Sequence, residues 1–391
     1  MDKTPNHTTL IATLRDTELG AAQYHHGITV FPLFPANVSP GSPGSASVPN
    51  APSGPDVAGI SAQLLSLSRA LESNLVEIRE IGESGSVPEL QVINGSDRLV
   101  LGLDGEEIAG AKQNRVLQTT ILFAPRSETL IPVNCVEAGR WQYTGNDKFA
   151  HSGYHMSKRQ RSRKVRSVNV SLHAAQSFAG DQNETWNGIS EMNQTFACES
   201  PTGASKDVYA MTARLIHKYL QAFPCTEGQT GLLVLNRNGG VEGFDLTSNA
   251  SVYGDNHTGL LRSYLTSVLM EERLQGRFSP NEVISDTGGE DRSSAHVREL
   301  QDKGIEFIRT SFAESKTHAF DGVGLGQELR FDEDTSVGSA LIWQDAVMHC
   351  TCFQHDERSR IPGRGNRAWS RRMKSRRFRS TPQNPDDNID R

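Results

Sequence analysis

The sequence predicts an α+β protein that is rich in sheet, with short antiparallel strands and a few packed helices. Short β-branched and aromatic runs separated by turn dipeptides fill the chain up to Val136, and apolar residues spaced by three or four follow from Asp181. A third set of strand-like runs closes the body before residue 355. Strands, then helices, then strands again disfavour the regular alternation that builds a parallel α/β sheet.

Length and composition divide the chain into a body and its extensions. We expect one domain over residues 21–355, a disordered N-terminus over 1–20 and a disordered Arg-rich tail over 356–391. Pro, Gly, Ser, Ala and Asn dominate residues 35–59, and such a composition buries too little apolar surface to offset its ordering entropy. We therefore expect a flexible insertion within the domain.

The first half carries most of the predicted strands. Because proline lacks a backbone N–H, Pro32 favours a sheet edge for its strand. Asn94-Gly95 and Asp104-Gly105 tolerate positive φ, so they suit tight hairpins. Strand patterns occupy residues 27–34, 75–81 and several short runs within 87–136, and a helical pattern of leucines occupies 60–72.

The second half carries the predicted helices. Lys and Arg crowd into residues 158–166, which we interpret as a solvated loop or helix face. Apolar spacing predicts helices from Asp181, from Ser205 to a stop at Pro224, and over 260–269. Strands are predicted at 231–235 and 241–244, joined by the Asn238-Gly239 turn, and at 305–312, 328–331 and 340–353.

Charge and cysteine content bear on the compartment and on partners. Five scattered cysteines favour a reducing compartment, and neither a signal peptide nor a spanning apolar run of about 20 residues is present, so we expect a cytoplasmic protein with no membrane segment. Ten Lys and Arg residues between Arg358 and Arg379 contrast with a net charge of −6 for the whole chain. Such a tail could contact the acidic body of the chain itself, an acidic partner or nucleic acid.

A dense polar run within strand-like sequence marks the candidate site. On one continuous strand, Glu107, Gln113 and Arg115 would face one side, whereas Lys112 and Asn114 would face the other. A buried polar group without a partner costs about 1–3 kcal/mol. The run therefore indicates solvent exposure, an internal salt-bridged network or a bound polar ligand.

The residue types in this region suit an anionic ligand. Lys112, Arg115 and Arg140 could hold phosphate or carboxylate. Glu107 and Glu137 are the candidate catalytic bases. The expected ligand-binding residues are Lys112, Gln113, Asn114, Arg115, Arg140 and Trp141. If they form a ligand site, replacing Arg115 or Arg140 by Ala should abolish binding without unfolding; loss of the fold would favour an internal network.

Other motifs carry less chemistry. Cys135 lies in a strand-like run with no histidine close in sequence, so we expect a buried, inert thiol. The run from His349 to His355 contains four potential metal ligands, but on a strand Cys350 and Cys352 share a face that His349 does not, and we expect no metal site. The sequence lacks a P-loop, a Rossmann fingerprint and a Gly-x-Ser-x-Gly elbow, so no cofactor is predicted. Gly322–Gly326 precedes a strand and is expected to be a loop.

The long motifs Leu103–Glu107, Gly110–Arg115 and Ile131–Trp141 resemble one bacterial family, the ADP-ribosylglycohydrolase and rhodanese/phosphatase-superfamily-associated protein domain. The resemblance extends from Tyr24 to about Phe353. The family is named for the proteins that it accompanies, which implies ADP-ribose, NAD-derived or phosphorylated ligands. Further similarity lies at Gly85–Leu90, Asp181-Gln182, Trp186, Ser200–Gly203 and Gly231–Tyr264.

Three functions follow as hypotheses. The first is a binding or accessory module for a small anionic ligand, ADP-ribose-like or nucleotide-like, at the polar run. The second is a hydrolase of such a ligand, with Glu107 or Glu137 as general base. The third is association with nucleic acid through the basic tail.

Overall fold

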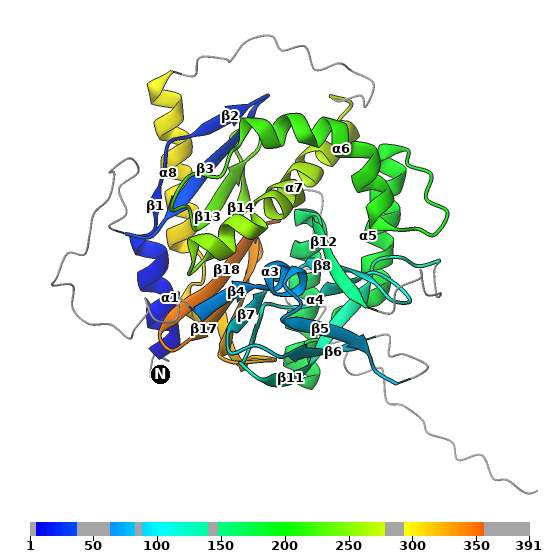
Figure 1. The fold of residues 1–391 in the computed structure, drawn as a ribbon. Helices are drawn as coiled ribbons and strands as arrows, with labels where there is room; N and C mark the ends of the chain where they lie inside the picture. The colour runs from blue at the N-terminus through cyan, green and yellow to red at the C-terminus, as the bar shows by residue number, and fades with distance from the viewer. Residues whose placement is uncertain (1–4, 37–62, 83–87, 140–147, 278–292, 356–391) are drawn as a thin grey trace, which may run out of the picture. The chain divides into compact units, whose positions relative to one another are not determined.

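Sheets and helices make up the body of the chain, as predicted (Figure 1). The computed structural model describes residues 5–36, 63–82, 88–139, 148–277 and 293–355. The α+β, sheet-rich class is confirmed. Nearly all of the expected insertion at 35–59 and the whole expected tail at 356–391 lie outside the described residues.

The largest sheet has nine antiparallel strands in the order β1-β3-β13-β14-β18-β17-β16-β15, with β2 beside β3. The predicted hairpin is confirmed as β13 and β14, and the run at 340–353 is the hairpin of β17 and β18. The strands are β1 (Glu18–Leu19), β2 (Gln23–His25), β3 (Ile28–Phe34), β13 (Gly231–Leu235), β14 (Val241–Thr247), β15 (Thr317–Asp321), β16 (Gln327–Asp332), β17 (Ser336–Trp343) and β18 (Ala346–Gln354).

The prediction that Pro32 marks a sheet edge is wrong, because β3 pairs on both sides. The Pro32 carbonyl accepts from the Gly20 N–H at 2.8 Å, which shows that Pro32 directs its backbone polar groups toward β1 and β2. On that side β1 ends its pairing at Leu33 and β2 begins at Val30. The missing N–H therefore falls between two short partners, where no ladder hydrogen bond needs it.

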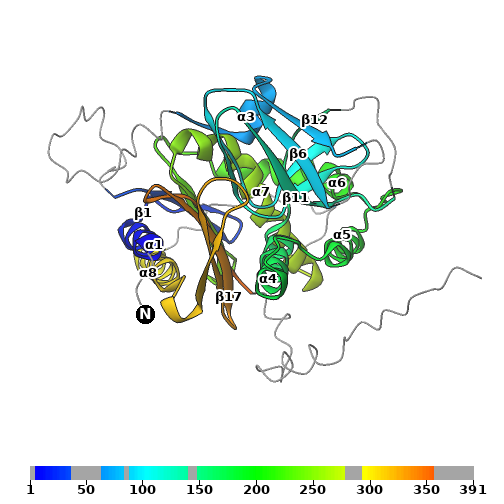
Figure 2. The ribbon, with the colours of Figure 1, turned by 90° about the horizontal axis from the view of Figure 1, so that it is seen from below.

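Helices cover both faces of this sheet (Figure 2). On one face lie α1 (Pro5–Asp16) and α8 (Ser294–Thr310), whose Leu10, Leu14 and Leu300 pack with Phe31 and Leu233. On the other face lie α6 (Ser205–Ala222) and α7 (Ala250–Leu274), and α5 (Gln182–Phe196) packs against these two helices. The apolar spacing of the sequence predicted all three helices. Loop Gly322–Gly326, between β15 and β16, is also as expected.

Two predictions about the first face are wrong. Residues 1–20 were expected to be disordered, but α1 forms because Leu10 and Leu14 are wholly buried against the sheet. Residues 305–312 were expected to form a strand, but most of them belong to α8. Leu300, Gly304 and Ile308 repeat at helical spacing and are its buried residues, so the helical stripe overrides the β-branched composition.

The second sheet has six antiparallel strands in the order β12-β8-β9-β11-β6-β5. Its two edge strands approach each other, since Lys148 Nζ lies 3.8 Å from Glu77 Oε1. The strands are β5 (Val76–Glu80), β6 (Glu89–Asn94), β8 (Glu106–Gly110), β9 (Arg115–Leu117), β11 (Ser127–Cys135) and β12 (Phe149–His155).

A third, three-stranded sheet connects to this one through shared apolar packing. Its order is β10 (Ile121–Phe123), β7 (Leu99–Gly102), β4 (Leu64–Ser66), and β4 runs parallel to β7. The helix predicted at 60–72 is thus a short strand followed by α3 (Leu67–Glu72). Asn94-Gly95 and Asp104-Gly105 do not close hairpins, because the strands on either side of each pair with other partners.

Candidate functional site

The polar run is a hairpin and not one continuous strand. Strand β8 ends at Gly110, a short turn follows, and β9 begins at Arg115. Gly110 has φ of 141° and Ala111 has φ of 42°, so the backbone reverses there. The predicted alternation of faces from Glu107 to Arg115 is therefore wrong, and the side chains separate into different environments.

Glu107 is held by hydrogen bonds from two side chains. The carboxylate accepts from Ser205 Oγ at 3.1 Å and from Asn114 Nδ2 at 3.2 Å. The side chain is buried, and this loss of hydration raises the pKa of Glu107 to about 7, despite both hydrogen bonds. The nearby charge of Glu137 contributes in the same direction. Glu107 is thus an acid that can change protonation near neutral pH.

Glu137 lies beside it, on the segment that follows β11. Its Oε1 accepts from Thr202 Oγ1 at 2.8 Å and lies 3.7 Å from Lys206 Nζ. Backbone contacts fix this segment to the start of α6: Gly139 N donates to Thr202 O at 2.7 Å, and Ser205 N donates to Val136 O at 3.1 Å. The structure therefore brings together the two glutamates that the sequence singled out.

The N-terminus of α6 completes what we call the carboxylate site. Ala204 caps this helix without a side-chain hydrogen bond, so the carboxylates lie close to N–H groups that carry partial positive charge. The Lys206 side chain is 48% exposed and Thr202 is partly exposed, which marks the side from which a ligand could approach. The site comprises Glu107, Asn114, Glu137, Thr202, Ser205 and Lys206.

The other predicted ligand-binding residues lie in different places. Arg115 is wholly buried, lies 3.4 Å from Glu80 and donates to Gln113 Oε1 at 3.1 Å. Gln113 Nε2 in turn donates to the Glu137 carbonyl at 2.7 Å, which ties the turn to the carboxylate site. Lys112, in the same turn, is 8% exposed. Arg140 and Trp141 lie outside the described residues.

The sequence missed a buried charge network on α4 (Lys158–Ala175). Arg161 forms a double ion pair with Asp245 on β14, and Lys164 Nζ lies 2.5 Å from Asp104 Oδ2. Tyr264 donates to Asp245 at 2.8 Å, and His349 lies 3.1 Å from the same carboxylate. The interpretation of residues 158–166 as a solvated face is wrong, because Lys158, Arg161 and Lys164 are buried and paired with distant acids.

This network supports the loop that leads into β8. Asp104 lies three residues before Glu107, and it is bonded both to Lys164 and, at 3.5 Å, to Arg161. The Asp104 N–H donates to Thr120 Oγ1, which also contacts His349 Nδ1 at 2.7 Å. The network thus positions the start of the strand that carries Glu107. In the sequence, the helical spacing of the basic residues Lys158, Arg161 and Lys164 was the signal that could have indicated one buried basic face of α4.

Cys135 is buried, and burial raises the pKa of its thiol, in agreement with the expected inert cysteine. On β18, Cys350 and Cys352 are buried together on the face that packs under α1 and α8.

Within the described ranges, no three His, Cys, Asp or Glu side chains gather closely enough to hold a metal ion. No described helix has the length and apolar run that crossing a bilayer requires.

Fold and site together define an α+β protein of mainly antiparallel sheets, with two buried carboxylates at a helix N-terminus. Over residues 16–353 the chain matches the model of the ARG and Rhodanese-Phosphatase-superfamily-associated Protein domain, ARPP-1, and it belongs to this family. The resemblance seen in the motifs is confirmed at this level. No curated protein and no solved structure matches the chain.

Proposed function

We propose that the chain binds a small, hydroxyl-rich anionic ligand, ADP-ribose-like or nucleotide-like, at the carboxylate site. The observation that carries this proposal is the pairing of two buried carboxylates with a half-exposed lysine. Glu107 and Glu137 supply acceptors suited to ribose hydroxyl groups, and Lys206 supplies a cation for phosphate. The family is named for its association with ARG and the rhodanese-phosphatase superfamily. The link to ADP-ribose rests on reading ARG as ADP-ribosylglycohydrolase, and so on association alone.

Hydrolysis of such a ligand is the second candidate, and the protonation of Glu107 favours it. Near pH 7 a carboxyl group with a pKa of about 7 is partly protonated, whereas an ordinary glutamate is ionised. Protonated Glu107 would give its proton to the departing base as the C–N glycosidic bond of a nucleotide-like ligand breaks. Glu137 would take a proton from the water that attacks the sugar carbon, so that the two residues exchange the roles of acid and base.

A thermal-shift and product screen of the full chain tests both candidates. ADP-ribose, NAD, a mononucleotide and inorganic phosphate are added separately, and the incubations are then analysed by mass spectrometry. Stabilisation by ADP-ribose that Lys206→Ala weakens supports the site. Absence of any shift with all four compounds contradicts it.

The Glu107→Gln variant separates binding from hydrolysis. Gln keeps the shape and the acceptor oxygen but cannot transfer the proton. For a hydrolase we expect product formation to fall about 100-fold or more while ligand-induced stabilisation remains. Glu306→Gln, on the exposed side of α8, is the matched control. Turnover by Glu107→Gln at the wild-type rate would remove Glu107 from the chemistry.

Association with nucleic acid through the basic tail is an independent proposal. The tail lies outside the described residues, so its support remains the charge of the sequence alone. A chain truncated after His355 should lose binding to a short duplex, and unchanged binding with unchanged salt dependence would contradict the proposal.

A further inference from the structure

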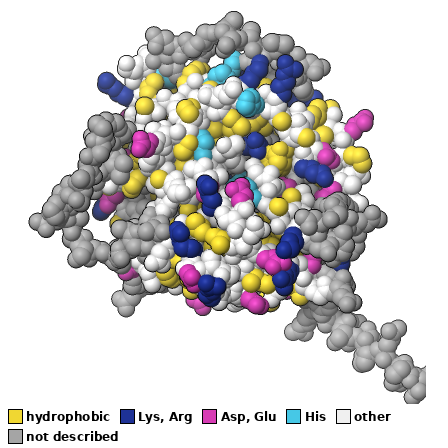
Figure 3. All heavy atoms as spheres, in the orientation of Figure 1, with side chains coloured by type: hydrophobic (Ala, Val, Ile, Leu, Met, Phe, Trp, Pro, Cys, Tyr) yellow, Lys and Arg dark blue, Asp and Glu magenta, His cyan; other side chains and the backbone are white. Residues whose placement is uncertain are grey.

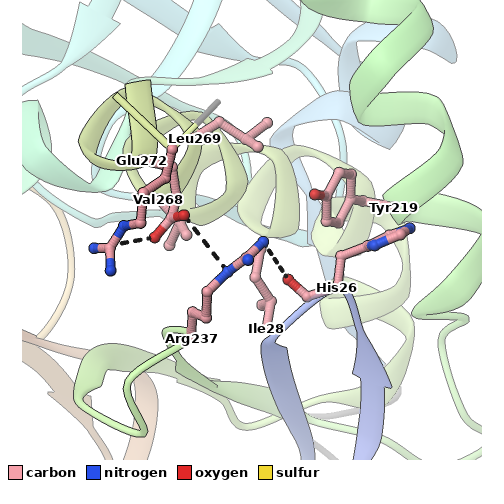
Figure 4. Close-up of a pocket in the computed structure, with 8 residues that line it drawn as sticks. His26, Ile28, Tyr219, Arg237, Val268, Leu269 and Glu272 are labelled. Atoms are coloured by element: carbon pink, nitrogen blue, oxygen red, sulfur yellow. Dashed lines mark hydrogen bonds and ion pairs between the residues drawn. The ribbon is translucent and has the colours of Figure 1, made fainter. Parts of the chain in front are cut away.

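Strand β15 forms a free edge of the nine-stranded sheet in the described part of the chain. At the other end of the sheet lie β1 and β2, which are only two and three residues long. The turn after β2 is tied to the body, because Arg237 donates to the His26 carbonyl at 3.3 Å and lies 3.5 Å from Glu272 (Figure 4). By contrast, β15 is five residues long and pairs on one side alone, with β16.

Two backbone hydrogen bonds define which groups of β15 face outward. Gly322 N donates to Gly326 O at 3.0 Å, one step beyond the last pair of the β15–β16 ladder. Across β16, Glu333 N donates to Ser336 O at 2.9 Å, one step beyond the last pair of the β16–β17 ladder. Bonded and non-bonded pairs alternate along an antiparallel ladder, and both bonds require the same alternation. The residues whose N–H and C=O groups point away from β16 are Thr317, Ala319 and Asp321.

These outward groups are open to another strand. No hydrogen bond reaches them from any other described residue, and Ala319 and Asp321 are exposed. Proteins usually blunt a free edge with lysine, proline or a bulge, and β15 has none of these. In the view of Figure 3, acidic, basic and apolar side chains are interspersed, so that face offers no broad apolar patch to a partner chain. A strand edge, by contrast, binds mainly through its backbone.

We infer that β15 pairs with β15 of a second copy of the chain, antiparallel and about a two-fold axis at Ala319. In this register Ala319 faces the partner's Ala319, and Thr317 faces the partner's Asp321. Every outward group of both strands is then bonded, because all three positions become hydrogen-bonded pairs. A shift of two residues leaves outward groups unpaired, and a shift of one sets outward groups against inward ones. The two-fold axis closes the assembly as a dimer.

The side chains of β15 suit this register. His318 would lie opposite the partner's Phe320, and aromatic pairs of this kind stabilise neighbouring strands. Within one chain both rings already contact His173 of α4, with ring centroids 4.6 and 5.4 Å from the His173 ring. Asp321 would lie opposite Thr317, so no like charges meet. The aromatic layer would therefore continue across the axis.

Sedimentation velocity of the full chain over a concentration series tests the inference, and we expect a reversible dimer. Ala319→Pro removes an N–H that points outward, so it should leave the β15–β16 ladder intact and weaken dimerisation about tenfold or more. Ala319→Ser keeps the N–H and, as the matched control, should dimerise like wild type. Circular dichroism checks that both variants are folded. A full chain that stays monomeric up to about 100 μM, or unchanged dimerisation of folded Ala319→Pro, would overturn the inference.

Cysteine cross-linking tests the register in a chain that carries Cys198→Ser and Cys225→Ser, which remove the two cysteines that are not buried. Ala319→Cys would place two thiols across the axis with Cα atoms about 5.5 Å apart, within the range of a disulfide. Two copies of Asp321→Cys would lie about 14 Å apart along the strands. We expect oxidation to link Ala319→Cys and to leave Asp321→Cys unlinked. Linkage of Asp321→Cys alone, or of neither variant, would overturn the inference without bearing on the carboxylate site.

Discussion

Arg161 holds Asp245 through both terminal guanidinium nitrogens, at 2.6 and 3.0 Å, and neither side chain is exposed to solvent. The pair joins α4 to the centre of the nine-stranded sheet. Asp245 accepts further hydrogen bonds from Tyr264, and its pKa lies well below the usual range because Arg161 and His349 offset its burial. It is therefore ionised at any physiological pH.

Removing Arg161 should be strongly destabilising. Arg161→Met keeps much of the side-chain volume but removes the positive charge that offsets the burial of the Asp245 and Asp104 carboxylates. Breaking a buried ion pair costs about 3–5 kcal/mol. Urea unfolding followed by circular dichroism measures the change in the free energy of unfolding. Arg126→Met, which removes an ion pair exposed on the surface, is the control and should have no measurable effect. Equal results for the two variants would contradict a stabilising role for the network.

Two glycines of α7 should respond oppositely to alanine. A Cβ at Gly259 would lie 2.6 Å from Nδ1 of His155, which is the buried last residue of β12, so Gly259→Ala should cost about 1–3 kcal/mol. At Gly254 nothing lies within 4 Å of the added Cβ, and Gly254→Ala should stabilise by up to about 1 kcal/mol through helix propensity. Thermal unfolding of both variants checks the contrast; a loss of stability in both would point to another cause.

Arg115→Ala should reduce stability before it reduces binding. The guanidinium is wholly buried, and its removal would leave the Glu80 carboxylate, only 6% exposed, without its ion pair. We expect a loss of about 3–5 kcal/mol in the free energy of unfolding. Ligand binding measured on the fraction that remains folded distinguishes the two interpretations of the polar run. A folded Arg115→Ala of wild-type stability that has lost binding would restore Arg115 to the ligand site.

Glu107 should make stability depend on pH. Burial raises its pKa to about 7 in the folded protein from 4.5, so the folded state binds the proton more tightly and stability falls as pH rises from about 5 to 7. Glu107→Gln removes this dependence. Between pH 5 and pH 8 its stability relative to wild type should improve by on the order of 3 kcal/mol. Urea titrations at the two pH values test this, and an unchanged difference would show that Glu107 is ionised throughout.

The local features of the fold could be predicted from sequence, and the long-range ones could not. Asp181 and the stripe Ile189, Met192, Phe196 define α5 through its cap and its spacing, both of which lie within the helix. By contrast, Arg161 is buried only because Asp104 and Asp245, 57 and 84 residues away, come to it. Nothing near residue 161 in sequence distinguishes it from a solvated arginine.

Only part of the candidate site could be predicted, because its other residues come from a distant part of the sequence. Glu107 and Glu137 stand out as polar residues in strand-like sequence, and they do meet. Ser205 and Lys206 begin α6, and Thr202 lies just before it. Their contact with the glutamates depends on an isolated β-bridge between Glu137, which follows β11, and Ala204. The chain reverses at Ala111, which has a positive φ although alanine is not a residue type typical of turns. The predicted alternation of faces from Glu107 to Arg115 was therefore wrong.

The register of β8 determines which glutamate reaches which part of the molecule. Glu106 and Glu107 are neighbours, yet Glu107 faces Ser205 of α6, whereas Glu106 lies 3.5 Å from His151 on β12. Because successive strand residues point to opposite faces, a slip of one position would exchange the two carboxylates. A shift of β8 by one residue against β9 and β12 would thus turn Glu106, in place of Glu107, toward Ser205 and Glu137.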